Sequence, residues 1–289
     1  MKLENESLLV EIAELGAEVT RIYDKETDTE ILWEGNPTYW KRHSPILFPN
    51  VGKTYQNTVR IDGRQYATSQ HGFARDSVFD LAGANGVSAS FVLRASEESK
   101  KAYPYEFELA VTYRLCKKEL EVEWQVKSLG GERTYFTIGA HPAFRFAKAE
   151  ETKDDYCLRF PGKEQLDYIL LDAASGTGVA DVVYPLLLEE GTCPLSEEMF
   201  ARDALVFDGG QIGEAWLCHK DKSPYVGVRC AEFENFGIWS VKDAPFVCLE
   251  PWAGRCDDKG FDGDISQKPG IHSVEGGDVF SRKYTIVVA

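Results

Sequence analysis

Hydrophobic and polar residues alternate over short stretches along most of the chain, which is the pattern of β-strands with one buried face. Turn-forming Gly, Asn and Asp residues separate these stretches at close intervals. The pattern predicts strands at residues 8–12, 18–23, 30–33, 88–94, 107–115, 120–127, 135–140, 205–207, 215–219, 225–230, 237–240, 246–250 and 281–288. A Lys-Lys-Glu break at 117–119 lies between two alternating runs and indicates a β-hairpin.

Long helical periodicity is missing from the chain. Only residues 195–203 predict a short helix, with Ser196 as its N-cap. No linker rich in Pro, Ser or Gly divides the sequence, and no internal repeat is visible. We therefore expect a single all-β domain over residues 1–289, built as a large antiparallel β-sandwich.

The charge balance argues against two classes of partner. The chain has 32 Lys and Arg against 47 Asp and Glu, a net charge of −15. Nucleic acids and anionic membrane surfaces both require clustered cations, so we expect neither as a partner. No apolar run reaches the ~18 residues of a membrane span, and the first residues lack the apolar core of a signal peptide. Seven cysteines without a Cys-x-x-Cys pair predict reduced thiols, and the expected location is cytoplasmic.

Three segments place polar residues in apolar or glycine-rich surroundings. The first is 69–76, where Gln70, His71 and Arg75 surround Gly72, a residue that lets the backbone approach a ligand closely. A surface loop with a hydrogen-bonded histidine is the alternative interpretation.

The second segment is 137–144. Strand alternation places Gly139 and His141 on one face, and Pro142 favours the end of the strand at that point. An imidazole at a strand end beside small residues is well placed to exchange a proton with a ligand near neutral pH. A core histidine bonded to a backbone carbonyl is the alternative.

The third segment is 245–252, where Glu250 ends an apolar strand. Alternation places it on the same face as Cys248, with Leu249 opposite. A carboxyl group against an apolar wall has a raised pKa and becomes a competent base. Trp252 offers a flat apolar face that could stack on a sugar ring. A strand-end glutamate that points to water is the alternative.

Together these segments resemble the aldose 1-epimerase (galactose mutarotase-like) family, in particular its LacX-like branch. The shared motifs follow the family order over nearly the whole chain. They are Gly-Ala-Glu at 16–18 with Leu-Trp at 32–33, Pro-x-x-Phe-Pro at 45–49, Gln-His-Gly-Phe-Ala-Arg at 70–75, His-Pro at 141–142 and Leu-Glu-Pro-Trp at 249–252.

The resemblance implies a galactose mutarotase-like supersandwich with a sugar site in a cleft across one sheet. It implies no cofactor and no metal, because changing the anomer of a sugar requires only proton movement. By the same resemblance His141 is the general acid and Glu250 the general base. His71 matches a second family histidine that hydrogen-bonds the sugar.

The resemblance also assigns substrate contacts. Gln70 and Arg75 flank His71, and Arg42 matches a substrate-binding arginine, with Lys41 as the alternative alignment. Asp203 matches an aspartate that binds sugar hydroxyls, with a solvent-facing side chain as the alternative. Trp252 completes the predicted site.

Two departures from the family bear on the choice of sugar. Lys53 stands where many LacX-like relatives carry arginine, so a bidentate partner for an anion is missing there. The Asn-Arg pair of the galactose-specific branch is absent, so galactose specificity is not implied.

Three other functions remain open. A hexose-6-phosphate 1-epimerase could bind its phosphate through Arg42, Lys53 and Arg75. A carbohydrate-binding or sensing protein could share the fold without turnover, although both proton-transfer groups are present. A glycosidase or lyase is the weakest alternative, because glycosidases commonly need two facing carboxylates and only Glu250 lies in a motif. The expected partner is a small sugar in each case.

Overall fold

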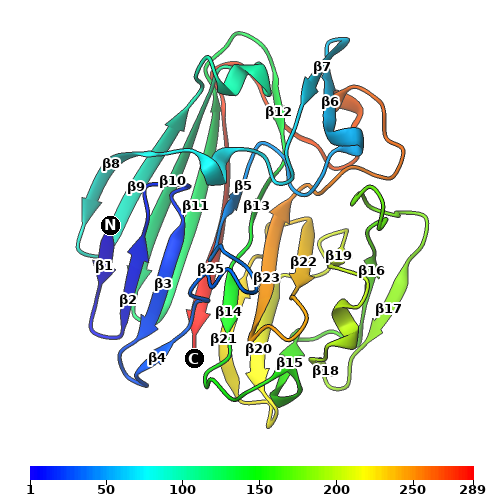
Figure 1. The fold of residues 1–289 in the computed structure, drawn as a ribbon. Helices are drawn as coiled ribbons and strands as arrows, with labels where there is room; N and C mark the ends of the chain where they lie inside the picture. The colour runs from blue at the N-terminus through cyan, green and yellow to red at the C-terminus, as the bar shows by residue number, and fades with distance from the viewer.

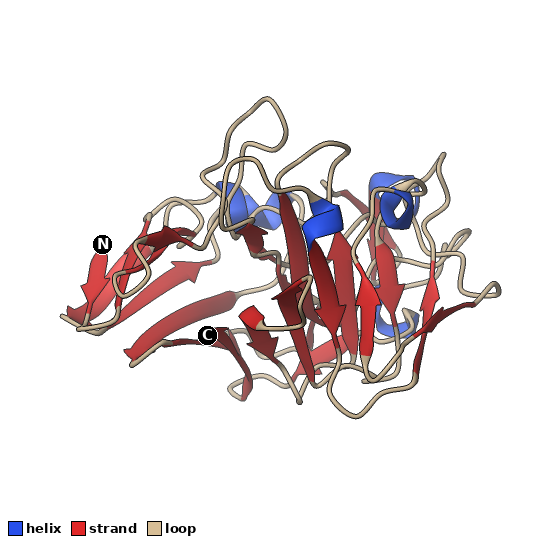
Figure 2. Ribbon diagram, turned by 90° about the horizontal axis from the view of Figure 1, so that it is seen from below, coloured by secondary structure: helices blue, strands red, loops and turns tan.

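The computed structural model describes all 289 residues and is built almost entirely of antiparallel β-sheet (Figures 1 and 2). The largest sheet has nine strands, in the order β18 (Thr192–Pro194), β15 (Tyr156–Arg159), β20 (Glu214–His219), β21 (Pro224–Arg229), β25 (Val279–Val288), β11 (Glu119–Ser128), β10 (Phe107–Cys116), β9 (Ser88–Arg94) and β8 (Asp80–Asn85). The second sheet has eight strands. Seven follow the order β17 (Tyr184–Leu187), β16 (Gln165–Ile169), β19 (Leu205–Phe207), β22 (Asn235–Trp239), β23 (Phe246–Ala253), β13 (Ile138–Ala140) and β5 (Ile46–Leu47), and β14 (Ala143–Arg145) pairs separately with β23.

Smaller sheets complete the sandwich. The N-terminal strands form a four-stranded sheet that lies in front of the nine-stranded sheet in Figure 1, and two further pairs lie near the top of that view. Their bounds are β1 (Lys2–Glu4), β2 (Leu8–Ile12), β3 (Val19–Asp24), β4 (Thr29–Glu30), β6 (Thr58–Ile61), β7 (Arg64–Ala67), β12 (Thr134–Phe136) and β24 (His272–Val274). The only helices are 3-10 turns, η1 (Tyr55–Asn57), η2 (Ala74–Asp76), η3 (Ser99–Lys101), η4 (Lys153–Asp155), η5 (Glu198–Phe200) and η6 (Ile265–Gln267). None of them is long and apolar enough to cross a membrane.

The core follows from the alternation that the sequence shows. In β10 every second side chain, from Phe107 to Leu115, is buried, and β11 repeats the pattern on its own buried face. These side chains belong to one cluster of 59 buried residues that also includes Val10 and Ile22 of the N-terminal sheet. The predicted all-β antiparallel sandwich is therefore confirmed. The ranges 8–12, 88–94 and 205–207 match the observed strands residue for residue.

Three predicted elements differ from the structure. The strand at 135–140 is two strands, β12 and β13, because Thr137 bonds to the segment after β5 instead of a sheet partner. The strand at 30–33 ends at Glu30, and Leu32 forms only an isolated bridge. The helix at 195–203 is the single turn η5, whose N-cap is Glu197 and not Ser196.

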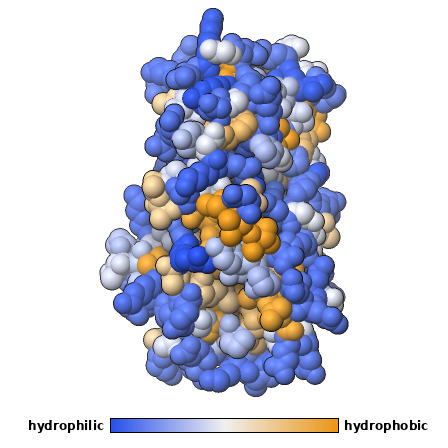
Figure 3. All heavy atoms as spheres, turned by 90° about the vertical axis from the view of Figure 1, so that its right-hand side faces the viewer, coloured by the Kyte–Doolittle hydropathy of each residue, from blue (hydrophilic) through white to orange (hydrophobic).

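An apolar edge closes the eight-stranded sheet. Figure 3 views the molecule from the side of β17, where apolar side chains gather. The exposed ones near this strand are Val182, Val183 and Leu187. As the outermost strand, β17 has one side without a sheet partner, whereas β23 and its neighbours are buried in the middle of the sheet. The centre of the sheet is therefore more completely buried than this edge.

Candidate functional site in a cleft over the eight-stranded sheet

A cleft of about 500 Å³ lies over the middle of the eight-stranded sheet. Side chains reach it from β19, β22 and β23 and from the segments that follow β5 and β13. All eight predicted site residues line this one cleft: His141, Glu250, His71, Arg42, Gln70, Arg75, Asp203 and Trp252. The structure thus brings together segments that lie as far apart in the sequence as residues 42 and 252.

Glu250 lies inside its strand rather than at the end. β23 continues to Ala253, so the predicted strand end at 250 is wrong. The side chain is almost completely buried, and the alternative of a glutamate pointing to water is therefore wrong as well. The predicted alternation holds, because Cys248 packs in a small cluster under the cleft while Leu249 belongs to the main core on the opposite face.

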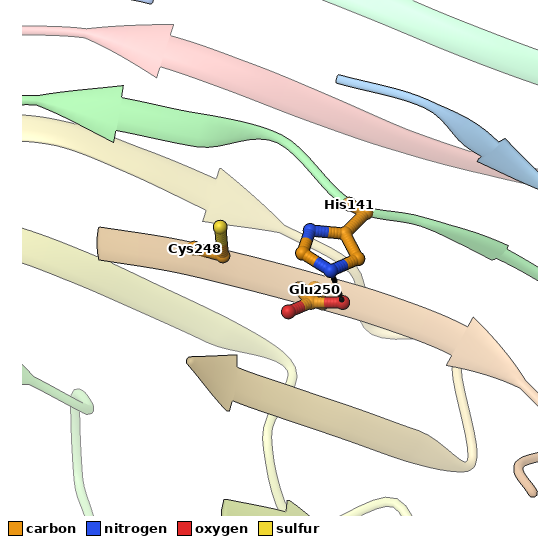
Figure 4. A group of neighbouring side chains, drawn as sticks. All are labelled: His141, Cys248 and Glu250. Atoms are coloured by element: carbon orange, nitrogen blue, oxygen red, sulfur yellow. Dashed lines mark ion pairs between the residues drawn. The ribbon is translucent and has the colours of Figure 1, made fainter. Parts of the chain in front are cut away.

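His141 and Glu250 face each other at the floor of the cleft (Figure 4). Nε2 of His141 lies 3.4 Å from Oε2 of Glu250, and both side chains are buried. Neither Nδ1 of His141 nor Oε2 of Glu250 has a hydrogen-bond partner in the protein. The alternative of a core histidine satisfied by a backbone carbonyl is therefore excluded. Buried polar atoms are rarely left without partners, so the pair retains unused hydrogen-bonding capacity.

Burial favours the uncharged form of both groups. It lowers the pKa of His141 to about 3, with the nearby charges of Arg75 and Arg42 acting in the same direction. Burial also raises the pKa of Glu250 well above its ordinary value of 4.5. Both shifts favour a neutral imidazole beside a protonated carboxyl group. The ion pair of a carboxylate and an imidazolium holds the same number of protons. Transfer of one proton from Glu250 to His141 therefore converts the neutral pair into the ion pair.

Two tryptophans that the sequence analysis did not select hold the His141 ring. Trp40 stacks on it with ring centroids 4.7 Å apart, and Trp239 meets it edge to face at 5.5 Å. The indole N–H of Trp33 donates to the carbonyl of Trp40 at 2.8 Å and fixes the position of that loop. The Leu-Trp motif at 32–33 is therefore linked to the orientation of the imidazole.

His71 is held in one tautomer by the backbone. Its Nδ1 accepts the N–H of Gly52 at 3.0 Å, so the proton of the neutral ring must be on Nε2. Burial lowers the pKa of His71 well below its ordinary value, which keeps the ring neutral. The ring is buried and lies 5.5 Å from that of His141, so the alternative of an exposed surface loop is wrong for this side chain.

The backbone around His71 depends on a glycine. His71 and Gly72 both have positive φ, and a Cβ on Gly72 would lie 2.2 Å from the carbonyl oxygen of Phe48. Only glycine fits this position, which explains the Gly in the motif at 70–75.

The two arginines at one end of the cleft are partly neutralised. Nη2 of Arg42 lies 2.8 Å from Asp76, and Nη2 of Arg75 donates to the carbonyl of Gln70 at 2.6 Å. Burial lowers the pKa of Arg75 to about 10, and the charge of Arg42 contributes. Asp76 offsets part of the positive charge that a phosphate would need.

Lys53 does not join the two arginines. It lines an adjoining cavity of about 720 Å³, which shares Gln70, Leu171, Gly176 and Asp203 with the cleft. Arg42, Lys53 and Arg75, which could together bind a phosphate, therefore do not converge on one point. Asp203 lies at the boundary of the two cavities and is exposed, so both a sugar contact and the solvent-facing alternative are compatible with its position.

Trp252 forms part of the cleft floor because its neighbours lack side chains. A Cβ on Gly139 of β13 would lie 2.4 Å from the indole, and one on Gly237 of β22 would lie 2.3 Å from it. The indole N–H donates to the carbonyl of Ala140 at 3.2 Å. The ring is thus fixed from both adjacent strands.

One set of side chains could hold a metal ion. The ligand atoms of His141, Cys248 and Glu250 all lie within 4.8 Å of one another (Figure 4). The family resemblance implies no metal, and the sequence does not reveal this set because its three residues come from two distant segments.

An antiparallel supersandwich with a buried imidazole and carboxyl pair in a central cleft defines the galactose mutarotase-like class. A galactose mutarotase related enzyme of Lactobacillus acidophilus has the same fold, with a TM-score of 0.94 and 30% identity, covering 100% of this chain and 97% of that one. A galactose mutarotase-like protein of Lactobacillus casei gives a TM-score of 0.91 at 29% identity, with 100% and 99% coverage.

Sequence comparison points the same way. The family model described as aldose 1-epimerase matches residues 1–180. The chromosomal protein LacX of Lactococcus lactis is 32% identical over 100% of this chain and 99% of its own length. A putative glucose-6-phosphate 1-epimerase of Escherichia coli is 30% identical over 39% of this chain and 40% of its own. The chain belongs to the aldose 1-epimerase family.

The packing of Trp252 gives a first prediction. Gly237→Ala should displace the indole and lower both stability and sugar affinity, since overpacking typically costs about 1–3 kcal/mol. Thermal unfolding and tryptophan fluorescence measure the effect. Gly83→Ala is the matched control, because Gly83 lies in strand β8 and a Cβ there would meet no atom within 4 Å. Equal effects of the two substitutions would contradict the proposed packing.

The raised pKa of Glu250 gives a second prediction. The unfolded chain loses this proton near pH 4.5, whereas the folded protein retains it to higher pH, so stability falls as pH rises between the two pKa values. Glu250→Gln removes the titrating group and should therefore stabilise the protein above pH 4.5. The gain should increase with pH, as measured by urea unfolding at pH 5 and pH 8. A variant less stable than the parent at pH 8 would contradict the assigned protonation state.

Proposed function

We propose that the protein is an aldose 1-epimerase that interconverts the α and β anomers of a hexose. The observation that supports this most strongly is the buried His141–Glu250 pair, 3.4 Å apart at the floor of the cleft with unpartnered polar atoms. General acid–base catalysis needs two positioned groups, each typically worth ~10²–10⁴ in rate.

The chemistry requires one proton to enter and one to leave. Glu250, as carboxylate, removes the proton of the C1 hydroxyl while His141, as imidazolium, protonates the ring oxygen. The C1–O5 bond breaks and an open-chain aldehyde forms. Rotation about C1–C2 exposes the other carbonyl face, and the reverse proton transfers close the ring. The pair begins and ends with one shared proton, so no external acid or base is consumed.

The remaining cleft residues bind the sugar. His71 carries its proton on Nε2 and donates to the ring or a hydroxyl oxygen, while Gln70, Arg42 and Arg75 contact hydroxyl groups at one end. Asp203 contacts hydroxyls where the cleft meets the adjoining cavity. Trp252 supplies an apolar face for the C–H groups of the ring. A cytoplasmic location belongs to this proposal and is supported by cysteines that are all free thiols, six of them buried.

A hexose 6-phosphate is the second candidate substrate. The partial match to a putative glucose-6-phosphate 1-epimerase favours it, as does the buried Arg75 Nε, which has no hydrogen-bond partner. The pairing of Arg42 with Asp76 and the separate position of Lys53 favour the uncharged sugar. We therefore place the free hexose first.

The acid and base assignments predict separate losses of turnover. Glu250→Gln should lower mutarotation by ~10²-fold or more with folding intact, because the isosteric amide cannot accept the proton. His141→Asn should remove most of kcat and leave sugar binding largely unchanged. Polarimetry on freshly dissolved α-glucose and α-galactose measures turnover, and Gly83→Ala serves as the control. Near-normal kcat in His141→Asn would move the acid role to His71.

Substitution of Arg75 tests whether the substrate is a free hexose or a hexose 6-phosphate. Arg75→Ala should raise KM for both glucose and glucose 6-phosphate by similar factors if the guanidinium contacts the ring. A much larger rise for the phosphate ester would show that Arg75 pairs with the phosphate, since a charge-assisted bond is then lost only with that substrate. Parallel measurement of Lys53→Ala shows which cavity holds the phosphate. A phosphate bound at Lys53 would raise KM for glucose 6-phosphate selectively in Lys53→Ala instead of in Arg75→Ala.

A further inference from the structure

We infer that the floor of the cleft is a binding site for a thiophilic divalent cation such as Zn²⁺, and that the cation inhibits the enzyme. The site consists of His141, Cys248 and Glu250, whose ligand atoms lie within 4.8 Å of one another and are all buried. Cys248 and Glu250 are two residues apart on β23 and therefore point to the same face, toward the imidazole of His141 (Figure 4).

The spacing suits tetrahedral coordination. Bond lengths of about 2.0–2.2 Å from Zn²⁺ to nitrogen and oxygen place two ligand atoms about 3.4 Å apart across a tetrahedral angle. Nε2 of His141 and Oε2 of Glu250 are separated by 3.4 Å, and Oε2 has no partner that a metal would have to displace. Only the thiol of Cys248 must rotate inward to complete the three-ligand set.

The charge balance of the complex also suits a buried site. Binding replaces the protons of the Cys248 thiol and the Glu250 carboxyl group, and the two resulting negative charges neutralise the cation. The complex is therefore neutral overall, which limits the cost of burying it. Three protein ligands leave the fourth position open toward the cleft, as in zinc sites that exchange with solvent.

The surroundings of the imidazole indicate an inhibitory ion rather than a resident one. Resident metal sites almost always fix the second ring nitrogen of a ligating histidine through a carboxylate or carbonyl. Nδ1 of His141 has no such partner. A metal held by Nε2 would also occupy the atoms that the proposed proton transfer uses. Inhibition rests on the proposed function, whereas binding of the metal does not.

Co²⁺ is a suitable probe, because a thiolate ligand gives a charge-transfer band in the near ultraviolet and tetrahedral geometry gives strong visible absorption. The parent protein should show both, and Zn²⁺ should abolish them by competition. Cys248→Ala should lose the charge-transfer band, while Cys116→Ser, which removes the only exposed thiol, should keep it. A band that persists in Cys248→Ala, or no band in the parent protein, would overturn the inference.

Activity supplies the second readout. Zn²⁺ should inhibit mutarotation reversibly, chelation of the purified protein should not reduce turnover, and Cys248→Ala should raise the half-inhibitory Zn²⁺ concentration by at least roughly 10-fold. Equal inhibition of Cys248→Ala and the parent would overturn the site. If Cys248→Ala fails to fold, Glu250→Gln retains the thiol and should weaken Co²⁺ binding by a similar factor. Binding seen by absorption without inhibition would count against the proposed catalytic pair and would leave the metal site supported.

Discussion

The burial of one carboxyl group in the middle of a strand is the constraint on which the site depends. Glu250 pairs with Gly237 of β22 on one side of β23, lies opposite the break between β13 and β14 on the other, and is almost inaccessible to water. A charged carboxylate there would be costly, so the group keeps its proton and lies against an imidazole that burial also keeps neutral. The pair is stable as a neutral pair and reactive after a single proton shift.

The rest of the cleft is arranged around this pair. Glycines on the two flanking strands make space for Trp252, and the stacked Trp40 limits rotation of the His141 ring. The strand that would have run from 135 to 140 breaks at Thr137, whose hydroxyl accepts the N–H of Val51. This bond joins the end of β12 to the segment that carries Gly52, and Gly52 in turn fixes His71. The break in the strand at Thr137 thus helps to position His71.

The strands in which buried and exposed residues alternate could be predicted from the sequence, and so could the site residues that family motifs contain. Strands with one buried face, such as β2 and β9, were located residue for residue, whereas β8 has six exposed residues and offers no alternation to detect. Seven of the eight residues that share the cleft could be selected because they lie in or near a family motif, whereas Asp203 was selected only as a match to a single family aspartate.

Contacts across long sequence separations were not predictable in the same way. Trp40 and Trp239 contact His141 from distant segments of the chain and also contact each other, and Cys248 joins a ligand set with a residue more than 100 positions away. The separation of Lys53 from Arg42 and Arg75 is also invisible in the sequence, since it depends on how the segment at 52–53 passes Gly176. These features arise from the path of the loops, which binary patterning does not determine.

The hydrogen bond from the Gly52 N–H to Nδ1 of His71 makes the shape of the cleft depend on pH. A proton on Nδ1 would remove the lone pair that accepts this bond and place two donors against each other. The sheets themselves are joined by backbone bonds that do not titrate. Strong acid should therefore break this one bond, while the bonds from His71 N–H to the Gly52 carbonyl and from the Asn50 amide to the Ser69 carbonyl still join the two segments. The cleft would then lose the fixed tautomer of His71 with the sheets intact, and neutralisation would restore it.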